Sequence, residues 1–268
     1  MKNKKINKKK FIIACLICIT FILVVVFSII KAKPIIKLKS NFKSEKVNLQ
    51  FKDRTTDLAN YQYKDYLTIG WLQVQGTNID YPILSSNAAN DEDVTKNYGW
   101  RSPYYQSNEN REVLLGHNIV NVSSIPIRDM SVLNNFEGLM AFTYDDFAKK
   151  NLYISYTKNN ETSIYKIYAV GFYVYESTSD TGYTDKEEIT SYINKTRKNS
   201  IYDYDVDVTA EDELLTLKTC TRYFGIEGKR AFTIDARKIR ENEDTITYEV
   251  KTNNNYQELS KGVSNENS

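Results

Sequence analysis

Alternation between apolar and polar residues predicts a chain built mainly of β-strands. Residues 151–176 alternate on both sides of a turn at 158–160, which is the period expected of strands with two distinct faces. Residues 67–84 contain two apolar-rich runs around the turn signal Gln75-Gly76-Thr77-Asn78, which predicts a hairpin. Apolar runs predict three further strands, at 111–119, 213–220 and 230–239.

One segment changes to the helical period. Between residues 184 and 199, side chains of one predicted face recur every three to four positions, at Ile189, Tyr192, Ile193 and Thr196. Thr184 followed three residues later by Glu187 predicts a capping box at the start of this helix. Residues 40–66 are rich in helix formers and predict one or two helices, whereas the polar residues 85–110 predict a long irregular connection.

The N-terminal segment predicts a membrane anchor. Residues 11–30 contain no charge, Pro or Gly, and a helix of this length rises about 30 Å, enough to cross a bilayer core. Six lysines lie in residues 1–10 and four in residues 31–39, which favours a cytoplasmic N-terminus and an extracellular C-terminal portion. A cleaved signal peptide would need a shorter apolar core and a small-residue cleavage site, and a lipoprotein signal at Cys15 would need a longer apolar run before it. We therefore expect a single-pass membrane protein.

Charge limits the kinds of partner. Residues 40–268 carry 26 basic and 34 acidic residues, a net charge of about −8, which argues against binding to nucleic acid. The expected domain organisation is a linker with N-terminal helices (31–66), a β-domain (67–240) and a polar, partly disordered tail (241–268).

Cysteine and histidine are scarce. Cys220 is the only cysteine outside the apolar segment, and His117 is the only histidine of the chain. An unpaired cysteine in an exported domain is either a buried, inert residue or a reactive thiol. A nearby cation lowers a thiol pKa, and an arginine can also stabilise an oxyanion, so Arg230 at the start of a predicted strand is the third candidate. One histidine and one cysteine outside the apolar segment are too few to bind a metal through soft ligands, and we expect neither a metal nor another cofactor.

Four motifs resemble the sortase family. Thr216-Leu-Lys-Thr-Cys220 followed by Arg230 is similar to the family's T-L-x-T-C signature and downstream arginine. His117 lies in a Gly-His pair like that of the family, and residues 70–82 resemble its first two strands. The resemblance covers about residues 66–240. It departs at Lys218, where the family often has Ser, and at Arg222, where class B members often have an acidic residue.

The resemblance is to class B in particular, because a helix precedes the cysteine strand and His117 is far from Cys220 in the sequence. It implies a closed, mostly antiparallel β-barrel of about eight strands with peripheral helices, including an N-terminal helical pair. Helix 184–199 would form one wall of a peptide groove, with Tyr183 as a substrate contact.

The implied reaction is transpeptidation. Cys220 would cleave a C-terminal sorting motif after Thr, through a thioacyl intermediate, with His117 as proton carrier and Arg230 as oxyanion donor. Thr219 would contribute to substrate binding from beside the cysteine. The partners would be surface proteins that carry the motif and an amine on a cell-wall precursor. Two alternatives remain open: a pilin-polymerising sortase that uses a lysine amine, and a non-catalytic, membrane-tethered β-barrel binding protein.

Overall fold

The computed structural model describes residues 41–106, 109–122, 126–174, 182–225 and 230–257. The chain divides into two units, residues 1–43 and residues 44–268, and the second contains the fold described below. Within the described ranges, no helix is both long and apolar enough to cross a bilayer. The predicted anchor at residues 11–30 lies outside those ranges.

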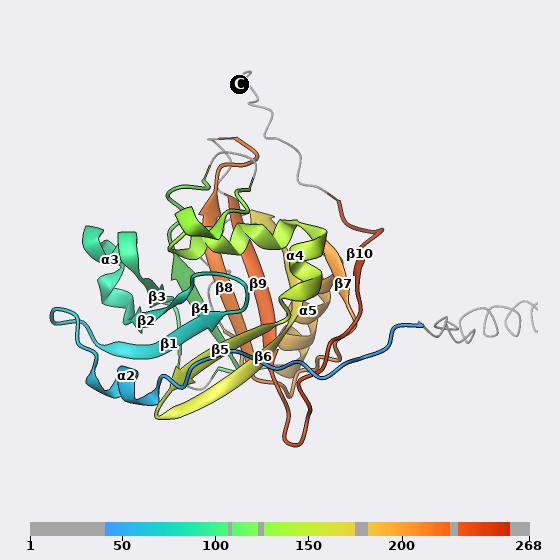
Figure 1. Cartoon of the computed structure of the whole chain (residues 1–268), viewed down its shortest axis with the longest axis horizontal. Coiled ribbons are helices and arrows are strands. Elements are labelled where there is room, and N and C mark those ends of the chain that lie inside the picture. Colours follow the sequence, from blue (N-terminus) through green and yellow to red (C-terminus); the bar gives the residue numbers. More distant parts are fainter. Residues whose placement is uncertain (1–40, 107–108, 123–125, 175–181, 226–229, 258–268) are drawn as a thin grey trace, which may run out of the picture. The chain divides into compact units, whose positions relative to one another are not determined.

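Eight strands close into a barrel in the order β1-β2-β3-β4-β8-β9-β6-β5 (Figure 1). This confirms the expected barrel of about eight strands. Most neighbours are antiparallel, but β2 pairs with β3, and β4 with β8, in parallel. The strands are β1 (Thr68–Val74), β2 (Asp80–Leu84), β3 (Gly99–Arg101), β4 (Arg111–Gly116), β5 (Tyr153–Lys158), β6 (Glu161–Val174), β8 (Leu214–Thr221) and β9 (Arg230–Lys238).

Two tight turns explain why the predicted hairpins form. Gly76 has a φ of 76° between β1 and β2, and glycine adopts such a conformation without steric cost. Asn159 and Asn160 have φ values of 51° and 61° between β5 and β6, and two successive residues with positive φ match the right-handed twist of a hairpin. Both hairpins were predicted at these positions and are confirmed.

The connection at 85–110 is more regular than predicted. It contains η1 (Ser86–Asn90), α3 (Glu92–Asn97) and strand β3. The Asp91 carboxylate accepts the N–H groups of Asp93 and Val94 and so caps α3. The prediction failed here because each element is too short to show a period in the sequence. The segment before β1 contains one short helix in its described part, α2 (Thr55–Asn60), which agrees with the prediction of one or two helices. The second helix of the implied pair is not present in residues 41–66.

Helix α5 (Lys186–Lys198) confirms the predicted helix, but its cap is different. Asp185, and not Thr184, is the N-cap residue, and its carboxylate accepts the N–H groups of Glu187 and Glu188. Ile189 and Ile193 are buried beneath the helix, as the helical period predicted.

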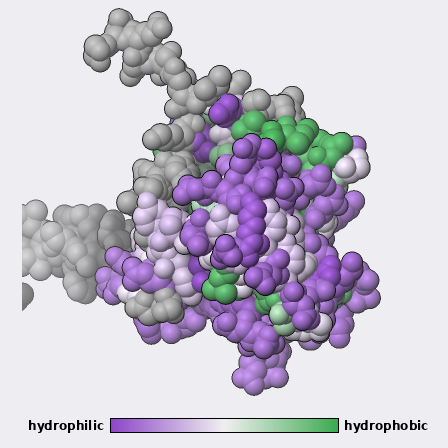
Figure 2. Space-filling model, turned by 90° about the vertical axis from the view of Figure 1, so that its left-hand side faces the viewer, coloured by the Kyte–Doolittle hydropathy of each residue, from purple (hydrophilic) through white to green (hydrophobic). Residues whose placement is uncertain are grey.

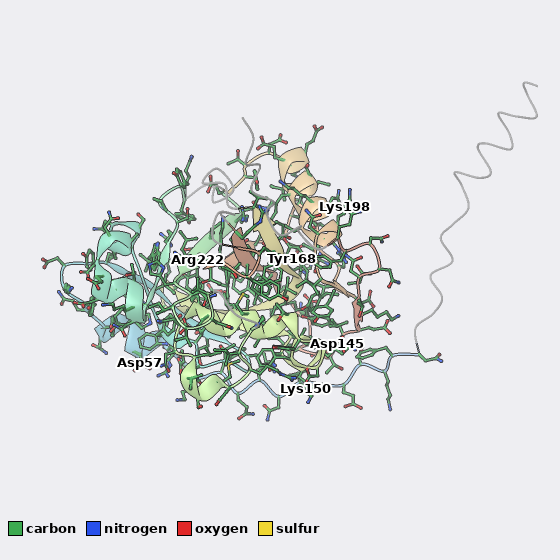
Figure 3. The ribbon with its side chains drawn as sticks, turned by 90° about the horizontal axis from the view of Figure 1, so that it is seen from above. Asp57, Asp145, Lys150, Tyr168, Lys198 and Arg222 are labelled. Atoms are coloured by element: carbon green, nitrogen blue, oxygen red, sulfur yellow. The ribbon has the colours of Figure 1, made fainter. Side chains whose placement is uncertain are left out.

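The chain between β4 and β5 forms short helices. They are η2 (Met130–Val132), η3 (Phe136–Thr143) and α4 (Asp145–Lys150). Seven successive residues of η3, from Phe136 to Phe142, are buried, and η3 contacts β6, β8 and β9. Figure 3 shows Asp145 and Lys150, at the two ends of α4, on one side of the barrel.

The polar C-terminal segment packs on the barrel as far as it is described. β10 (Val250–Thr252) pairs with β7 (Tyr202–Tyr204) in a separate two-stranded sheet. The Tyr248 side chain is buried, and its hydroxyl donates to the carbonyl of Leu152. Its polar composition alone does not predict these contacts.

The surface contrasts with this core. Figure 2 shows a face that is mostly hydrophilic, with an apolar patch near its upper edge. Only a few large hydrophobic side chains are well exposed among the described residues, and they include Ile119, Val120 and Val174.

Candidate active site

Three adjacent strands bring the candidate residues to one edge of the barrel. Gly116, the last residue of β4, pairs with Thr219 of β8, so His117 and Cys220 are the next residues on two neighbouring chains. Cys220 pairs with Ala231 of β9, directly beside Arg230. Because neighbouring strands lie about 4.8 Å apart, the three residues share one small region of the surface. The sequence separates His117 from Cys220 by more than 100 positions, and the parallel pairing of β4 with β8 removes that separation.

Strand β8 exposes only its cysteine. Seven of its eight residues are buried, and Cys220 is the exception. Leu215 and Leu217 belong to the hydrophobic core. Thr216, on the opposite face of the strand, is covered by α5 and lies 3.1 Å from the Tyr192 hydroxyl of that helix. The thiol is therefore accessible at the end of an otherwise covered strand, and it is not buried.

The His117 ring is half-buried against Trp100. The two rings meet edge to face, with centroids 5.3 Å apart. Burial lowers the pKa of His117 below its ordinary value of 6.5, because desolvation disfavours the imidazolium form. The lowered pKa favours the neutral imidazole, which can accept a proton.

The chain after His117 is held by a network of amides. Asn121 donates its backbone N–H to the Asn118 side chain at 2.9 Å, and the Asn118 amide donates back to the Asn121 carbonyl at 3.1 Å. The Val122 carbonyl then accepts the backbone N–H of Arg222, just beyond Cys220. The loop that begins at His117 is therefore joined to the chain that continues from Cys220.

A buried carboxyl group supports the same loop. Glu137 in η3 is almost fully buried and accepts backbone N–H groups from Ile119, Asn134 and Asn135. Burial raises its pKa, because the charged form is poorly solvated there. Through Ile119, this side chain holds the backbone two residues after His117.

The glycine before His117 is required by packing. A Cβ atom at Gly116 would lie 2.3 Å from the aromatic ring of Phe136, which is fully buried. The ring cannot move without disturbing η3. The Gly-His pair of the sequence therefore has a structural cause as well as a chemical one.

Arg230 reaches the site from the next strand. It pairs with Thr221, one position closer to the strand end than the Cys220–Ala231 pair. Its Nε is buried and has no hydrogen-bond partner among the described residues. A buried N–H without a partner is costly, so this donor is available to an acceptor that enters the site.

The two expected substrate contacts lie in different places. Thr219 is buried, and its hydroxyl donates to the Gly116 carbonyl at 2.8 Å, which favours a positioning role. The centroid of the Tyr183 ring lies 5.4 Å from that of Tyr192, with the two rings tilted, and the guanidinium of Arg111, the first residue of β4, lies over the Tyr183 ring. Six residues of strand span about 20 Å, so Tyr183 is not brought together with His117 or Cys220. A contact between Tyr183 and a distant part of a peptide stays a prediction.

Sequence reasoning missed two residues of the site, Trp100 and Glu137. Neither belongs to a motif. Trp100 lies on a strand of three residues, and Glu137 becomes buried only through the packing of η3. Of the residues at this site, only His117, Cys220 and Arg230 lie in sequence motifs that indicated a function.

Several known proteins resemble this chain in sequence or in fold. No family model matches it. Sortase B of Listeria monocytogenes serovar 1/2a is 28% identical over 192 residues, which cover 65% of this chain and 70% of that protein. Clostridium perfringens sortase B has the same fold, with a TM-score of 0.54 and 22% identity over 69% of this chain and 99% of the other. A sortase B solved in complex with triglycine has a TM-score of 0.52 and 17% identity over 65% of this chain and 81% of the other.

The barrel, the exposed thiol beside an imidazole and these similarities together define a cysteine transpeptidase. In sequence and in fold, the chain is similar to class B sortases.

Proposed function

We propose that this enzyme cleaves a C-terminal sorting motif after a Thr residue and transfers the protein to an amine on a cell-wall precursor. Cys220 is the nucleophile, His117 carries the proton and Arg230 stabilises the oxyanion. The observation that carries these assignments is the register of β4, β8 and β9, which gathers the three residues at adjacent strand ends.

The first step forms a thioester. The Cys220 sulfur attacks the carbonyl carbon of the Thr residue, and the carbonyl oxygen becomes negatively charged. The unpartnered Nε of Arg230 is a suitable donor to this oxygen. As the sulfur attacks, His117 takes the proton of the Cys220 thiol. The C–N bond then breaks, and His117 passes this proton to the leaving amine. In the second step His117 takes a proton from the incoming amine. A lowered His117 pKa suits the second role, because the neutral imidazole is the base.

The partners follow from the same reaction. The first substrate is a surface protein with the sorting motif, and the second is an amine. The complex of another sortase B with triglycine supports an acceptor with a free amino group. Helix α5 covers β8 as far as Thr216, which supports its role as one wall of the peptide groove.

A trapping experiment tests the reaction. The protein is incubated with a library of sorting-motif peptides, and the covalent adduct is identified by mass spectrometry. We expect an acyl group on Cys220 in the wild-type enzyme and none in Cys220→Ala, because no other thiol lies outside residues 11–30. Substantial peptide cleavage by Cys220→Ala would show that the proposed nucleophile is wrong.

We also propose that residues 11–30 anchor the enzyme in the cell membrane, with the barrel outside the cell. The uncharged run and the flanking lysines support this arrangement. The exposed thiol of Cys220 gives a direct test. A membrane-impermeant maleimide should label wild-type protein in intact cells and should not label Cys220→Ala. Labelling that requires cell lysis would place the barrel on the other side of the membrane.

A further inference from the structure

Two cationic residues flank the thiol in the sequence. Lys218 lies two residues before Cys220 on the same face of β8, and Arg222 is the first residue after β8, two residues beyond Cys220. Lys218 is buried and already has an interaction partner. Arg222 is exposed, and its side chain makes no hydrogen bond or ion pair in the part of the chain that is described. Of these two cations, Arg222 is therefore the one whose side chain is free to bind a ligand.

The Arg222 backbone is fixed although its side chain is free. Its N–H donates to the Val122 carbonyl, and its carbonyl accepts the N–H of Gly225 at 2.9 Å. The guanidinium thus projects from a held position two residues beyond the thiol, at a Cα–Cα separation of about 7 Å from Cys220. A cation in this position is within reach of a group bound at the sulfur.

The position of α5 indicates which substrate Arg222 meets. Tyr192 of α5 contacts Thr216 and Asp235, on the side of Cys220 where Lys218 lies. If α5 is the wall of the peptide groove, the sorting peptide occupies that side. Arg222 lies on the other side of the thiol, next to the loop that carries His117. In the view from above, Arg222 is set apart from Lys198 at the end of α5 (Figure 3).

We propose that Arg222 binds a carboxylate of the amine acceptor, and that the preferred acceptor carries a free carboxylate within a few bonds of its reactive amine. Arginine pairs with a carboxylate through two parallel hydrogen bonds, which fix the orientation of the partner as well as its position. This pairing would aim the amine at the thioester between His117 and Cys220. The inference rests on the proposed transpeptidation and specifies its second substrate.

The step that Arg222 assists is aminolysis of the thioester. The amine nitrogen attacks the acyl carbon and a C–N bond forms. The C–S bond breaks, and its electron pair stays on the Cys220 sulfur. The proton lost by the amine passes to His117 and then to the sulfur, which restores the thiol. Arg222 takes no part in bond making and acts only as a specificity residue.

The test compares acceptors that differ in a single charge. Cadaverine, lysine and diaminopimelate share a carbon chain that ends in an amine, and they carry zero, one and two carboxylates. The full-length enzyme is acylated with a sorting-motif peptide, and transfer to each acceptor is measured against hydrolysis. The variants are Arg222→Gln, which removes the charge, and Arg222→Lys, which keeps it. Lys251→Gln is the control, because it removes an exposed charge on β10.

We expect Arg222→Gln to lower kcat/KM for diaminopimelate by roughly tenfold or more and to leave cadaverine unchanged. Arg222→Lys should show an intermediate loss, and Lys251→Gln none. An equal loss for all acceptors, no loss, or slower formation of the thioester would each overturn the proposal. Failure of wild-type protein to form any thioester would instead contradict the proposed function, so the two failures are distinguishable.

Discussion

Thr219 and Gly116 join the two strands that carry the nucleophile and the base. The Thr219 hydroxyl donates to the Gly116 carbonyl at 2.8 Å, one residue before Cys220 on β8 and one residue before His117 on β4. The hydrogen bond is buried, so water does not compete with it. It fixes the relative position of the thiol and the imidazole from beneath.

We therefore predict that Thr219→Val lowers catalytic activity as well as stability, because the Thr219 hydroxyl positions the reacting groups. Valine keeps the size of the side chain but leaves the buried Gly116 carbonyl without this donor, at a cost of about 1–3 kcal/mol. Activity should fall by on the order of tenfold or more, mainly in kcat, because small displacements of reacting groups are costly. Peptide cleavage kinetics and thermal melts measure the two effects.

Thr157→Val is the matched control for this variant. Thr157 is equally buried, and its hydroxyl lies 2.8 Å from that of Thr162, in the β5–β6 hairpin. It should lose similar stability and keep full activity. If both variants lose activity to the same extent, the Thr219 hydroxyl has no special role.

The sequence predicted those elements whose residues repeat a pattern over several positions. The alternation at 151–176 is long enough to identify β5 and β6, and the period at 184–199 identifies α5. Strand β3 has three residues and β10 has three, too few for any period. Their pairing depends on contacts with distant segments. The cap of α5 was displaced by one residue because Thr184 and Asp185 are both good capping residues, and the sequence alone does not choose between them.

Only those residues of the candidate site whose types are rare in this chain could be predicted from the sequence. With a single histidine and a single cysteine outside the apolar segment, His117 and Cys220 could be chosen as candidates without a structure. Tryptophan and glutamate occur in many structural roles, so nothing in the sequence marked Trp100 or Glu137. Their contribution is to bury the ring and to hold the loop, and both depend on the folded chain.

Trp100→Leu should move the acid limb of the pH–rate profile. The imidazolium form of His117 cannot accept a proton, so transfer to an amine should fall as the pH drops through the lowered pKa. A smaller side chain at position 100 would expose the ring and raise this pKa toward 6.5. The acid limb should then shift to higher pH. An unchanged limb would mean that Trp100 does not control the solvation of His117.

Docking of α5 should depend on its buried isoleucines. Ile193 is 4% exposed, and its replacement by Ala should destabilise the protein by about 2–5 kcal/mol. Asn194→Ala, at the exposed neighbouring position, should have little effect. If α5 is a wall of the groove, Ile193→Ala should also raise KM for the peptide, whereas Asn194→Ala should not. Wild-type peptide kinetics in an Ile193→Ala variant that has lost stability would argue against that role.

The Glu137 side chain should control the loop after His117. Glu137→Ala removes the acceptor of the Ile119 N–H, at a cost of about 1–3 kcal/mol, and amide hydrogen exchange over residues 117–122 should become faster. Glu137→Gln keeps an acceptor oxygen and should keep most of the protection. Glu92→Gln, at an exposed position of α3, is the control for loss of one charge.

The same Glu137→Gln variant should reveal the raised pKa of Glu137. A carboxyl group with a raised folded-state pKa stabilises the fold below its unfolded-state pKa, and this contribution is lost as the pH rises through the folded-state value. As the pH rises through the folded-state pKa of Glu137, the wild type should therefore lose stability relative to Glu137→Gln. Denaturant unfolding at several pH values measures the difference, and a constant difference would contradict the assignment.

Arg230→Lys tests whether charge alone is enough at the oxyanion position. Lysine keeps the positive charge but has a methylene carbon, which cannot donate a hydrogen bond, at the place of the buried Nε, and that Nε has no protein partner among the described residues. It also lacks the planar fork that aims two N–H groups at one oxygen. If Arg230 donates to the oxyanion, the rate of thioester formation should fall by on the order of 10²–10³-fold. The variant should melt near the wild-type temperature, because Arg230 lies at a strand end and outside the hydrophobic core. Single-turnover acylation, followed by mass spectrometry, separates this step from aminolysis. Full activity in Arg230→Lys would show that a positive charge suffices, and the role of oxyanion donor would then have to be assigned to another group.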